Sequence, residues 1–387
     1  MGDAARPSLD VPRIDKGLDD VFVKETSICF VDGQQGRLLY RGYDIRDLAE
    51  RSSFEETAFL LLHGSLPNRG EVERIRADLG AARVLPHALL QDLRRMPRDA
   101  PPMDVLRTMA SLMSAFDPER DDASRDANLR RSVRILGGLA SLIAAYHRLR
   151  SGQRILRPDP RRGHAEDFLR MVTGKRPTRR HARIMDVAMV LYADHSMNAS
   201  TFAATVAAST LADLYSAFVA AIATLKGPLH GGAIEASYNT IRAIGRPEAA
   251  EEHVLGILQS GGKVFGFGHR VYKTYDPRAL LFRELVRELS EEAEQPELFQ
   301  VAEAIQETVV RELHAKRIYP NVDFYSGLML HFLGFPADLS TPFFAAARAV
   351  GWAAHVLEYW QDNRILRPLD FYVGPKDAPY VPIDERP

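Results

Sequence analysis

The sequence predicts an all-α fold made of a large helical domain, a smaller helical lobe and one short β-hairpin near the N-terminus. Strand patterns nearly vanish after residue 42, and helix start and stop signals punctuate the rest of the chain. The 387 residues also exceed what one hydrophobic core usually serves. The predicted helices cover residues 54–64, 103–116, 128–152, a series from 181 to 226, 277–290, 301–316 and 341–363.

Local signals predict the first two elements. Residues 27–42 hold two apolar-rich runs around a turn that carries Asp32 and Gly33, a pattern typical of a β-hairpin. Ser53 and Glu56 have the spacing of a capping box, in which each side chain accepts a backbone N–H of the other residue. The first helix is therefore expected to begin directly after Ser53.

Glycines divide the helical series into two parts. Glycines at 227, 231 and 232, and again at 334, interrupt the helical run and suit hinges around an inserted lobe. We expect the large domain to cover residues 1–230 and 340–387, and the small lobe to cover 231–339.

Two segments and the C-terminal tail are expected to be irregular. Residues 117–127 are rich in charge, and residues 153–165 are rich in Arg and Pro. The tail from residue 367 to 387 carries prolines at five positions, which prevents a helix there. An extended tail needs a surface to lie on, and a partner subunit would provide one.

The composition excludes several classes of function. Lys and Arg number 50 and Asp and Glu 51, so no overall field attracts nucleic acid or an anionic membrane. Cys29 is the one cysteine, which rules out an internal disulfide framework and a cysteine-built zinc site. The first 17 residues lack the apolar core of a signal peptide, and the apolar stretch 214–225 is too short to cross a bilayer. These features predict a cytoplasmic protein.

Three histidines stand in unusual surroundings. His230 follows the end of an Ala-rich helix and precedes two glycines, which let a ligand approach the backbone closely, and a histidine that caps a helix end is the alternative there. His269 follows Gly266 and Gly268 and precedes a basic strip, and a solvated basic loop is the alternative there. His195 lies in a polar break between helical stretches. The other histidines, including those at 63, 147 and 164, are expected to be structural.

The loop around His269 does not match the common phosphate-binding motifs. A Rossmann fingerprint needs a third glycine and a preceding strand, and Lys263 does not stand in a P-loop pattern. A glycine-lined loop with Lys273 close by could still face an anionic cofactor.

Two arginines occupy positions that call for an anionic partner. Asp276 and Pro277 form a standard start of a helix, which places Arg278 at the second helical position, where the helix dipole disfavours a cation. Arg348 lies in a long charge-free helical stretch, so we expect it to be buried. A bound carboxylate would compensate both charges, and an acidic side chain of the protein is the alternative for Arg348.

Asp323 completes the set of chemically suited groups. It stands just before an apolar helix, where it could cap the helix, face a cleft, or do both. Loop histidines, an aspartate and buried arginines together suit proton abstraction from carbon, with an acid polarising a carbonyl and arginines holding carboxylates. A metal-dependent hydrolase is less consistent with the sequence, because no His-Glu-x-x-His pair or similar ligand spacing occurs.

Several motifs in order along the chain match one family. They include "DHSMNASTF" (194–202), "KGPLHGGA" (226–233), "GFGHRVYKTYDPRA" (266–279), "YPNVDFYSG" (319–327) and "NRILRPLDFYVGP" (363–375). On these motifs the chain resembles the citrate synthase family, in its short bacterial and archaeal form. The resemblance implies the condensation of acetyl-CoA with oxaloacetate, followed by hydrolysis of citryl-CoA.

The resemblance also implies a role for each matching residue. Asp323 resembles the base that deprotonates acetyl-CoA, His230 the group that hydrogen-bonds the thioester oxygen, and His269 the group that polarises the oxaloacetate ketone. The residues implied to contact oxaloacetate are His195, Arg278, Arg348 and Arg367, the last from the other subunit of a homodimer. The positions implied to bind CoA are Lys263, Gly266, Gly268 and Lys273. The family needs no permanently bound cofactor and no metal.

One departure and two alternatives remain open. Ser196 stands where the family usually has Glu after the histidine of its "DHE" motif, so the resemblance does not define the orientation of His195. Methylcitrate synthases share the fold, use propionyl-CoA and tend to read "GHPVYT" and "FSA" where this chain has "GHRVYK" and "YSG". A CoA-binding relative without catalysis is the other alternative.

Overall fold

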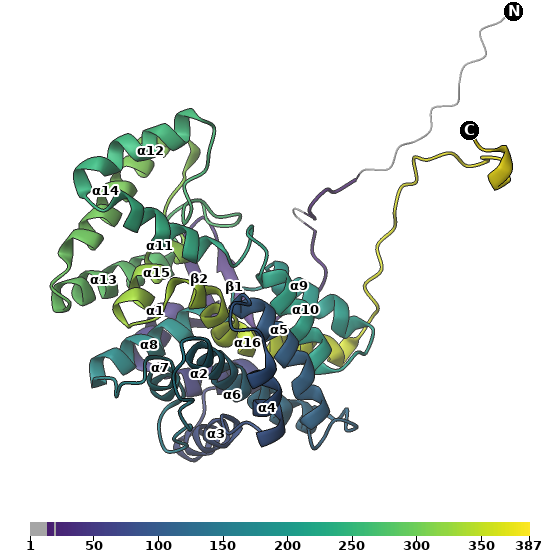
Figure 1. Ribbon diagram of the computed structural model, residues 1–387, viewed down its shortest axis with the longest axis horizontal. Coiled ribbons are helices and arrows are strands. Elements are labelled where there is room, and N and C mark those ends of the chain that lie inside the picture. Colours follow the sequence, from purple (N-terminus) through teal and green to yellow (C-terminus); the bar gives the residue numbers. More distant parts are fainter. Residues whose placement is uncertain (1–13, 19–20) are drawn as a thin grey trace, which may run out of the picture.

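The computed structural model describes residues 14–18 and 21–387 and is mainly helical, as the sequence predicts (Figure 1). Most of the N-terminal segment in which no targeting signal was found lies outside the described residues. The α-helices are α1 Ile45–Arg51, α2 Phe54–His63, α3 Arg69–Ala82, α4 His87–Arg95, α5 Pro102–Met113, α6 Arg125–Arg150, α7 His164–Thr173, α8 Arg179–Tyr192, α9 Ala199–Ser209, α10 Leu214–Leu225, α11 Ala233–Ile244, α12 Ala250–Gln259, α13 Pro277–Glu292, α14 Pro296–Glu312, α15 Val322–Phe332 and α16 Ser340–Tyr359.

The predicted hairpin is confirmed and carries a third short strand. β1 (Cys29–Asp32) pairs antiparallel with β2 (Arg37–Tyr40), and β2 pairs antiparallel with β3 (Tyr43–Asp44). The hairpin turn packs closely on a distant loop, because the Lys273 N–H donates to the Gly33 carbonyl at 2.8 Å. A Cβ on Gly33 would lie 2.1 Å from the Val271 oxygen, so this contact requires glycine.

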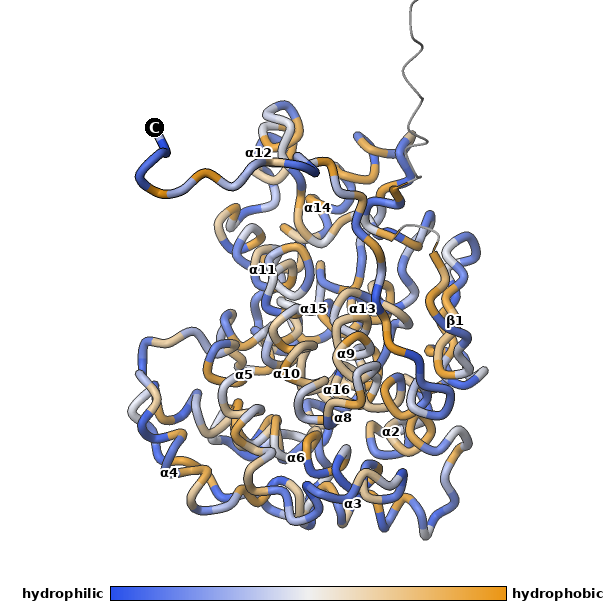
Figure 2. The backbone as a smooth tube through the Cα atoms, turned by 90° about the vertical axis from the view of Figure 1, so that its right-hand side faces the viewer, coloured by the Kyte–Doolittle hydropathy of each residue, from blue (hydrophilic) through white to orange (hydrophobic). Residues whose placement is uncertain are grey.

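Helix α16 forms the centre of the larger group of helices. All of its residues except Glu358 are buried, and it packs against α2, α6, α8, α9 and α10. Figure 2 shows α16 surrounded by other helices. A helix that is apolar on all sides needs such an enclosed position, and this position explains why a charge at Arg348 is buried.

A second group of helices lies to one side of this core. Helices α11, α13, α14 and α15 pack on one another, and α12 packs on α14, so these five gather at one end of the molecule (Figure 1). The groups meet where α13 contacts α8 and where α11 contacts α16. The division into domains at residues 230 and 340 stays a prediction.

Some predicted boundaries were wrong by a few residues. Ser124 caps α6 with its side chain, so the helix begins inside the segment expected to be a loop, and α7 takes the last two residues of the loop expected at 153–165. The predicted helical series from 181 to 226 consists of three helices: the polar break around His195 is confirmed, and Asn198 and Asp213 each cap a new helix.

The tail after residue 363 is extended apart from one 3-10 turn at Ile383–Glu385, and it projects away from the helices (Figure 1). Its apolar side chains are largely exposed, including Leu369, Val373 and Tyr380. Among the described residues, no helix is long and apolar enough to span a membrane.

Candidate functional site

Six of the predicted site residues gather where the two groups of helices meet. Three come from the larger group or its loops, and three come from the smaller group and the loop before α13. We call this set the site cluster: His195, His230, His269, Arg278, Asp323 and Arg348.

His195 and His269 face each other in the cluster. Their ring centroids are 5.0 Å apart in an edge-to-face arrangement, and the His195 Nε2 atom lies 3.3 Å from the hydroxyl of Tyr272. Tyr40 of β2 fixes the loop of His195, because its hydroxyl donates to the Asp194 carbonyl at 2.8 Å. Burial and the nearby Arg278 lower the pKa of His195 well below its ordinary value, so the imidazole is neutral.

The hydrogen bonds of His269 define its tautomer. Its Nδ1 atom accepts the backbone N–H of Val271 at 2.9 Å and that of Tyr272 at 3.2 Å. Burial lowers the pKa of His269 to about 4, so the ring is neutral and its one proton resides on Nε2. His269 therefore presents an N–H donor at the free edge of its ring.

His230 has the opposite arrangement. Its Nε2 atom lies 3.4 Å from the backbone N–H of Ser200, a group that can only donate, and 2.8 Å from the Ser200 hydroxyl. Burial, followed by Arg348, lowers the pKa of His230 to about 4, so the proton of the neutral ring resides on Nδ1. His230 does not cap α11, whose N-cap position, Gly232, has no side-chain cap, but its ring accepts a backbone N–H in the first turn of α9.

Asp323 does not cap its helix. Asn321 is the N-cap of α15 and accepts the Asp323 N–H, which leaves the Asp323 carboxylate free to face the cluster. Its Oδ1 atom accepts a hydrogen bond from the hydroxyl of Tyr192 at 3.1 Å. Burial raises the pKa of Asp323 to about 6, although this hydrogen bond and Arg278 act in the opposite direction. A carboxyl group with this pKa is well suited to act as a base near neutral pH.

The two buried arginines differ in their partners. Asp276 caps α13 as predicted and also binds the guanidinium of Arg278 through two hydrogen bonds, of 3.0 Å and 2.7 Å. Asp276 therefore supplies the negative charge beside Arg278 that the sequence led us to expect from a bound carboxylate. Arg348 forms no ion pair with any described residue, and its Nε–H donates to the Tyr192 carbonyl at 2.6 Å. Its guanidinium lies 4.7 Å from the centre of the Phe344 ring, and burial lowers its pKa.

The loop before His269 is fastened to the start of α15. The Gly268 N–H donates to Tyr319, and the side-chain amide of Asn321 donates to the Gly268 carbonyl at 2.8 Å. Gly266 has a φ of 81°, and a Cβ there would lie 2.8 Å from the Cα of Phe324. Lys263 and Lys273 are exposed beside this loop.

Arg367 lies apart from the site cluster. It is exposed on the extended tail, and within the described part of the chain no hydrogen bond or ion pair joins it to a cluster residue.

Sequence reasoning did not single out four residues that hold the cluster in place. Ser200 supports His230, Tyr192 supports Asp323 and Tyr272 contacts both His195 and His269. Asp194 accepts the N–H of Ser196, which adopts a left-handed φ of 53°. Tyr272 and Asp194 lie in quoted motifs, but no local signal distinguishes them.

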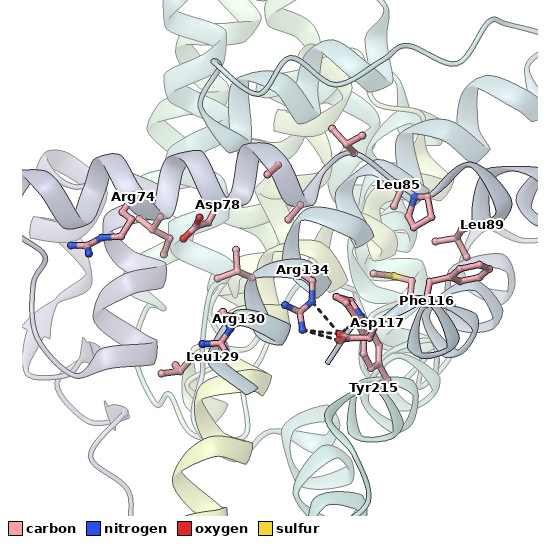
Figure 3. A pocket seen from close by; sticks show the side chains of 18 of the residues that line it. Arg74, Asp78, Leu85, Leu89, Phe116, Asp117, Leu129, Arg130, Arg134 and Tyr215 are labelled. Carbon is pink, nitrogen blue, oxygen red and sulfur yellow. Dashed lines mark hydrogen bonds and ion pairs between the residues drawn. The ribbon is translucent and has the colours of Figure 1, made fainter. Parts of the chain in front are cut away.

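A separate cavity of about 710 Å³ lies between α2, α3 and α6. Figure 3 shows Arg134 and Tyr215 on its wall, where both bind the buried carboxylate of Asp117, at 2.8 Å and 2.7 Å. No residue of the site cluster lines this cavity. Among the described residues, no three His, Cys, Asp or Glu side chains are grouped so that they could hold a metal ion.

Comparisons with known proteins agree with the geometry. The family model described as "Citrate synthase, C-terminal domain" matches residues 17–369. Citrate synthases from Deinococcus radiodurans and Haloferax volcanii are each 43% identical to this chain and cover 96% of it, with 99% and 98% of their own lengths. The structure of a Thermoplasma acidophilum citrate synthase in a ternary complex with carboxymethyl coenzyme A and oxaloacetate is also similar. It has a TM-score of 0.93 and 34% identity, over 97% of this chain and 100% of that one.

Proposed function

Since the chain belongs to the citrate synthase family, we propose that it condenses acetyl-CoA with oxaloacetate and hydrolyses the resulting citryl-CoA to citrate and CoA. The observation that carries this proposal is the site cluster. One carboxyl group with a pKa of about 6 lies among neutral histidines with opposite tautomers and two buried arginines.

Asp323 acts as the base in this proposal. The methyl protons of a thioester are only weakly acidic, so their removal requires that the developing enolate oxygen be stabilised at the same time. His230 provides this stabilisation, because its Nδ1–H donates to the thioester oxygen while Ser200 fixes the other ring nitrogen. The enol carbon then attacks the ketone carbon of oxaloacetate.

His269 stabilises the negative charge that develops on the ketone oxygen of oxaloacetate. Its Nε2–H donates to the ketone oxygen of oxaloacetate and protonates the alkoxide as the carbon–carbon bond forms. Arg278 and Arg348 hold the carboxylates of oxaloacetate, and His195 contacts the same substrate. Arg348 is well suited to this role because it is buried without an acidic partner among the described residues. Water then hydrolyses the citryl thioester and releases CoA.

The loop at 263–270 and Lys273 are assigned to CoA. The positive φ angles of Gly266 and Gly268 and the bonds to Tyr319 and Asn321 give the loop a defined shape. Lys263 at the start of the loop and Lys273, three residues beyond its end, are exposed, and a phosphate group of CoA could approach them.

The functional unit in this proposal is a homodimer in which Arg367 of one subunit binds oxaloacetate in the other. Its support is the exposed apolar tail and the absence of Arg367 from the site cluster of its own chain. Mixed dimers test it. An Asp323→Asn chain and an Arg367→Ala chain, each nearly inactive alone, regain one intact site when combined if the arginine crosses the interface. No regain on mixing would place Arg367 in its own subunit's site or in none.

The substrate is tested by comparing kcat/KM for acetyl-CoA and propionyl-CoA with oxaloacetate, with the product identified by mass spectrometry. We expect citrate as the main product and a clear preference for acetyl-CoA. A preference for propionyl-CoA would make the protein a 2-methylcitrate synthase, and no carbon–carbon bond formation with either thioester would refute the proposal.

A further inference from the structure

A buried tyrosine on α8 contacts the carboxylate to which the proposed function assigns the role of base. Tyr192 is 0% exposed, and its hydroxyl lies 3.1 Å from Asp323 Oδ1 and 2.8 Å from the hydroxyl of Ser326. The two residues of the first contact are 131 positions apart in the chain and belong to different groups of helices. The proposed catalytic steps assign no role to this hydroxyl.

The direction of these hydrogen bonds follows from the chemistry of the groups. The Asp323 carboxylate and the Val322 carbonyl, 3.4 Å away, can only accept, and the carboxylate is both nearer and charged, so it receives the single hydroxyl proton of Tyr192. Ser326 can then donate its own proton to the Tyr192 oxygen. Asp323 Oδ1 is thereby engaged, whereas Oδ2 forms no hydrogen bond with any described residue.

Aromatic packing and one main-chain bond hold Tyr192 in place. Its ring lies between Phe282 of α13 and Phe343 and Phe344 of α16, with centroids 5.8, 5.8 and 4.8 Å away. Its carbonyl accepts the Arg348 Nε–H at 2.6 Å. One rigid residue therefore contacts both the proposed base and an arginine assigned to the other substrate.

We propose that Tyr192 is the positioning residue of the base: it fixes Asp323 Oδ1 and leaves Oδ2 to take the α-proton of the acyl-CoA. This inference rests on the proposed function of Asp323. Because a carboxylate that rotates freely rarely presents one oxygen to the substrate, fixing Oδ1 raises the fraction of productive complexes.

Charged groups on three sides act on Asp323. Arg278 of α13 and Arg348 of α16 favour the carboxylate, and Asp276 before α13 opposes it. The hydrogen bond from Tyr192 also lowers the pKa of Asp323 relative to what burial alone would give. Removing the hydroxyl should therefore raise this pKa and move the acid limb of the pH profile to higher pH, because the base must be ionised.

The test is Tyr192→Phe, which keeps the ring and its packing. We expect kcat to fall by about 10- to 100-fold while KM for oxaloacetate changes less than about twofold. We also expect the acid limb of kcat/KM for acetyl-CoA to move up by about one pH unit. A merely structural role would lower stability without moving the limb, and an unmoved limb would overturn the inference.

Two further variants make the result specific. Ser326→Ala removes the donor behind Tyr192 and should move the limb in the same direction by a smaller amount, which keeps the test available if Tyr192→Phe folds poorly. Tyr215→Phe is the matched control, because it removes a buried hydroxyl bound to another carboxylate, Asp117, far from the cluster. Its pH profile should equal that of the wild type, and an equal shift there would also count against the inference.

Asp323→Asn separates the inference from the proposed function on which it rests. If that variant stays active, the assignment of the base is wrong. If it is inactive while Tyr192→Phe behaves as the wild type, only the role of Tyr192 is wrong.

Discussion

Asp323→Asn should make the protein more stable and nearly inactive. The pKa of Asp323 is about 6 in the folded protein against an ordinary 3.8, so at pH 7 the folded state holds an ionised carboxylate that its surroundings disfavour. The difference corresponds to about 3 kcal/mol, and about 1 to 3 kcal/mol once the partial exposure of the side chain is considered. An amide of the same shape removes this cost and can still accept the Tyr192 hydrogen bond.

The dependence on pH gives the sign of the effect. A carboxyl group whose pKa is raised on folding destabilises the protein progressively as pH rises from 3.8 to about 6, by a constant amount above that range and not at all below it. Urea unfolding at fixed protein concentration should therefore show Asp323→Asn more stable at pH 7.5, with the gain shrinking as the pH falls toward 4. The kcat should fall by orders of magnitude throughout. A gain that is absent or independent of pH would refute the argument.

Asp194 provides a control of opposite sign. It is also buried, but His355 binds its Oδ2 at 3.2 Å and lowers its pKa against the effect of burial. Its ionised form therefore stabilises the fold above the ordinary pKa, and that stabilisation is lost as pH falls. Asp194→Asn should consequently be less stable than the wild type at pH 7.5 in the same urea assay.

Other predictions concern substrate binding and the histidines. Arg348→Lys should raise KM for oxaloacetate by about 10- to 100-fold, since an ammonium cannot form the paired bonds of a guanidinium, and steady-state kinetics would show an unchanged KM if this is wrong. Gly266→Ala should lower stability by about 1 to 3 kcal/mol in thermal unfolding, more than Gly42→Ala, where the φ is similarly positive but no atom lies within 4 Å. NMR of ¹⁵N-histidine should find His269 protonated on Nε2 and His230 on Nδ1 at pH 7, and a shared tautomer would contradict the roles assigned to them.

The sequence predicts those parts of the fold that depend on local signals. The capping box of Ser53 and Glu56 and the cap at Asp276 are as predicted. The helices that were not predicted are α1, α3, α4, α7, α11 and α12. In α3 few residues are apolar, and only Ile75, Leu79 and Gly80 are buried. Such a helix is stabilised mainly by contacts with neighbouring helices in the folded protein, and no short stretch of sequence shows these contacts.

In the site, too, residues with a local signal could be predicted and residues that depend on long-range contacts could not. Arg348 and Arg278 could be found from the sequence, since an isolated charge in an apolar helix or at the start of a helix is costly without a partner. Tyr192 could not be found, because its role comes from a contact with a carboxylate 131 positions away. The sequence predicted that Asp276 caps α13, but it did not predict that the same carboxylate also binds the guanidinium of Arg278.

The contacts of the first fifty residues also constrain how the chain can fold. Lys24 binds Glu358, 334 positions later, and the hairpin turn binds the loop that carries His269. During synthesis the hairpin is made long before either partner. Its long-range contacts therefore cannot form until the C-terminal part of the chain has been made. A fragment that ends before α16 could form many of the helices, but it could not assemble the site. Recovery of activity during refolding should therefore report the last long-range contacts to form.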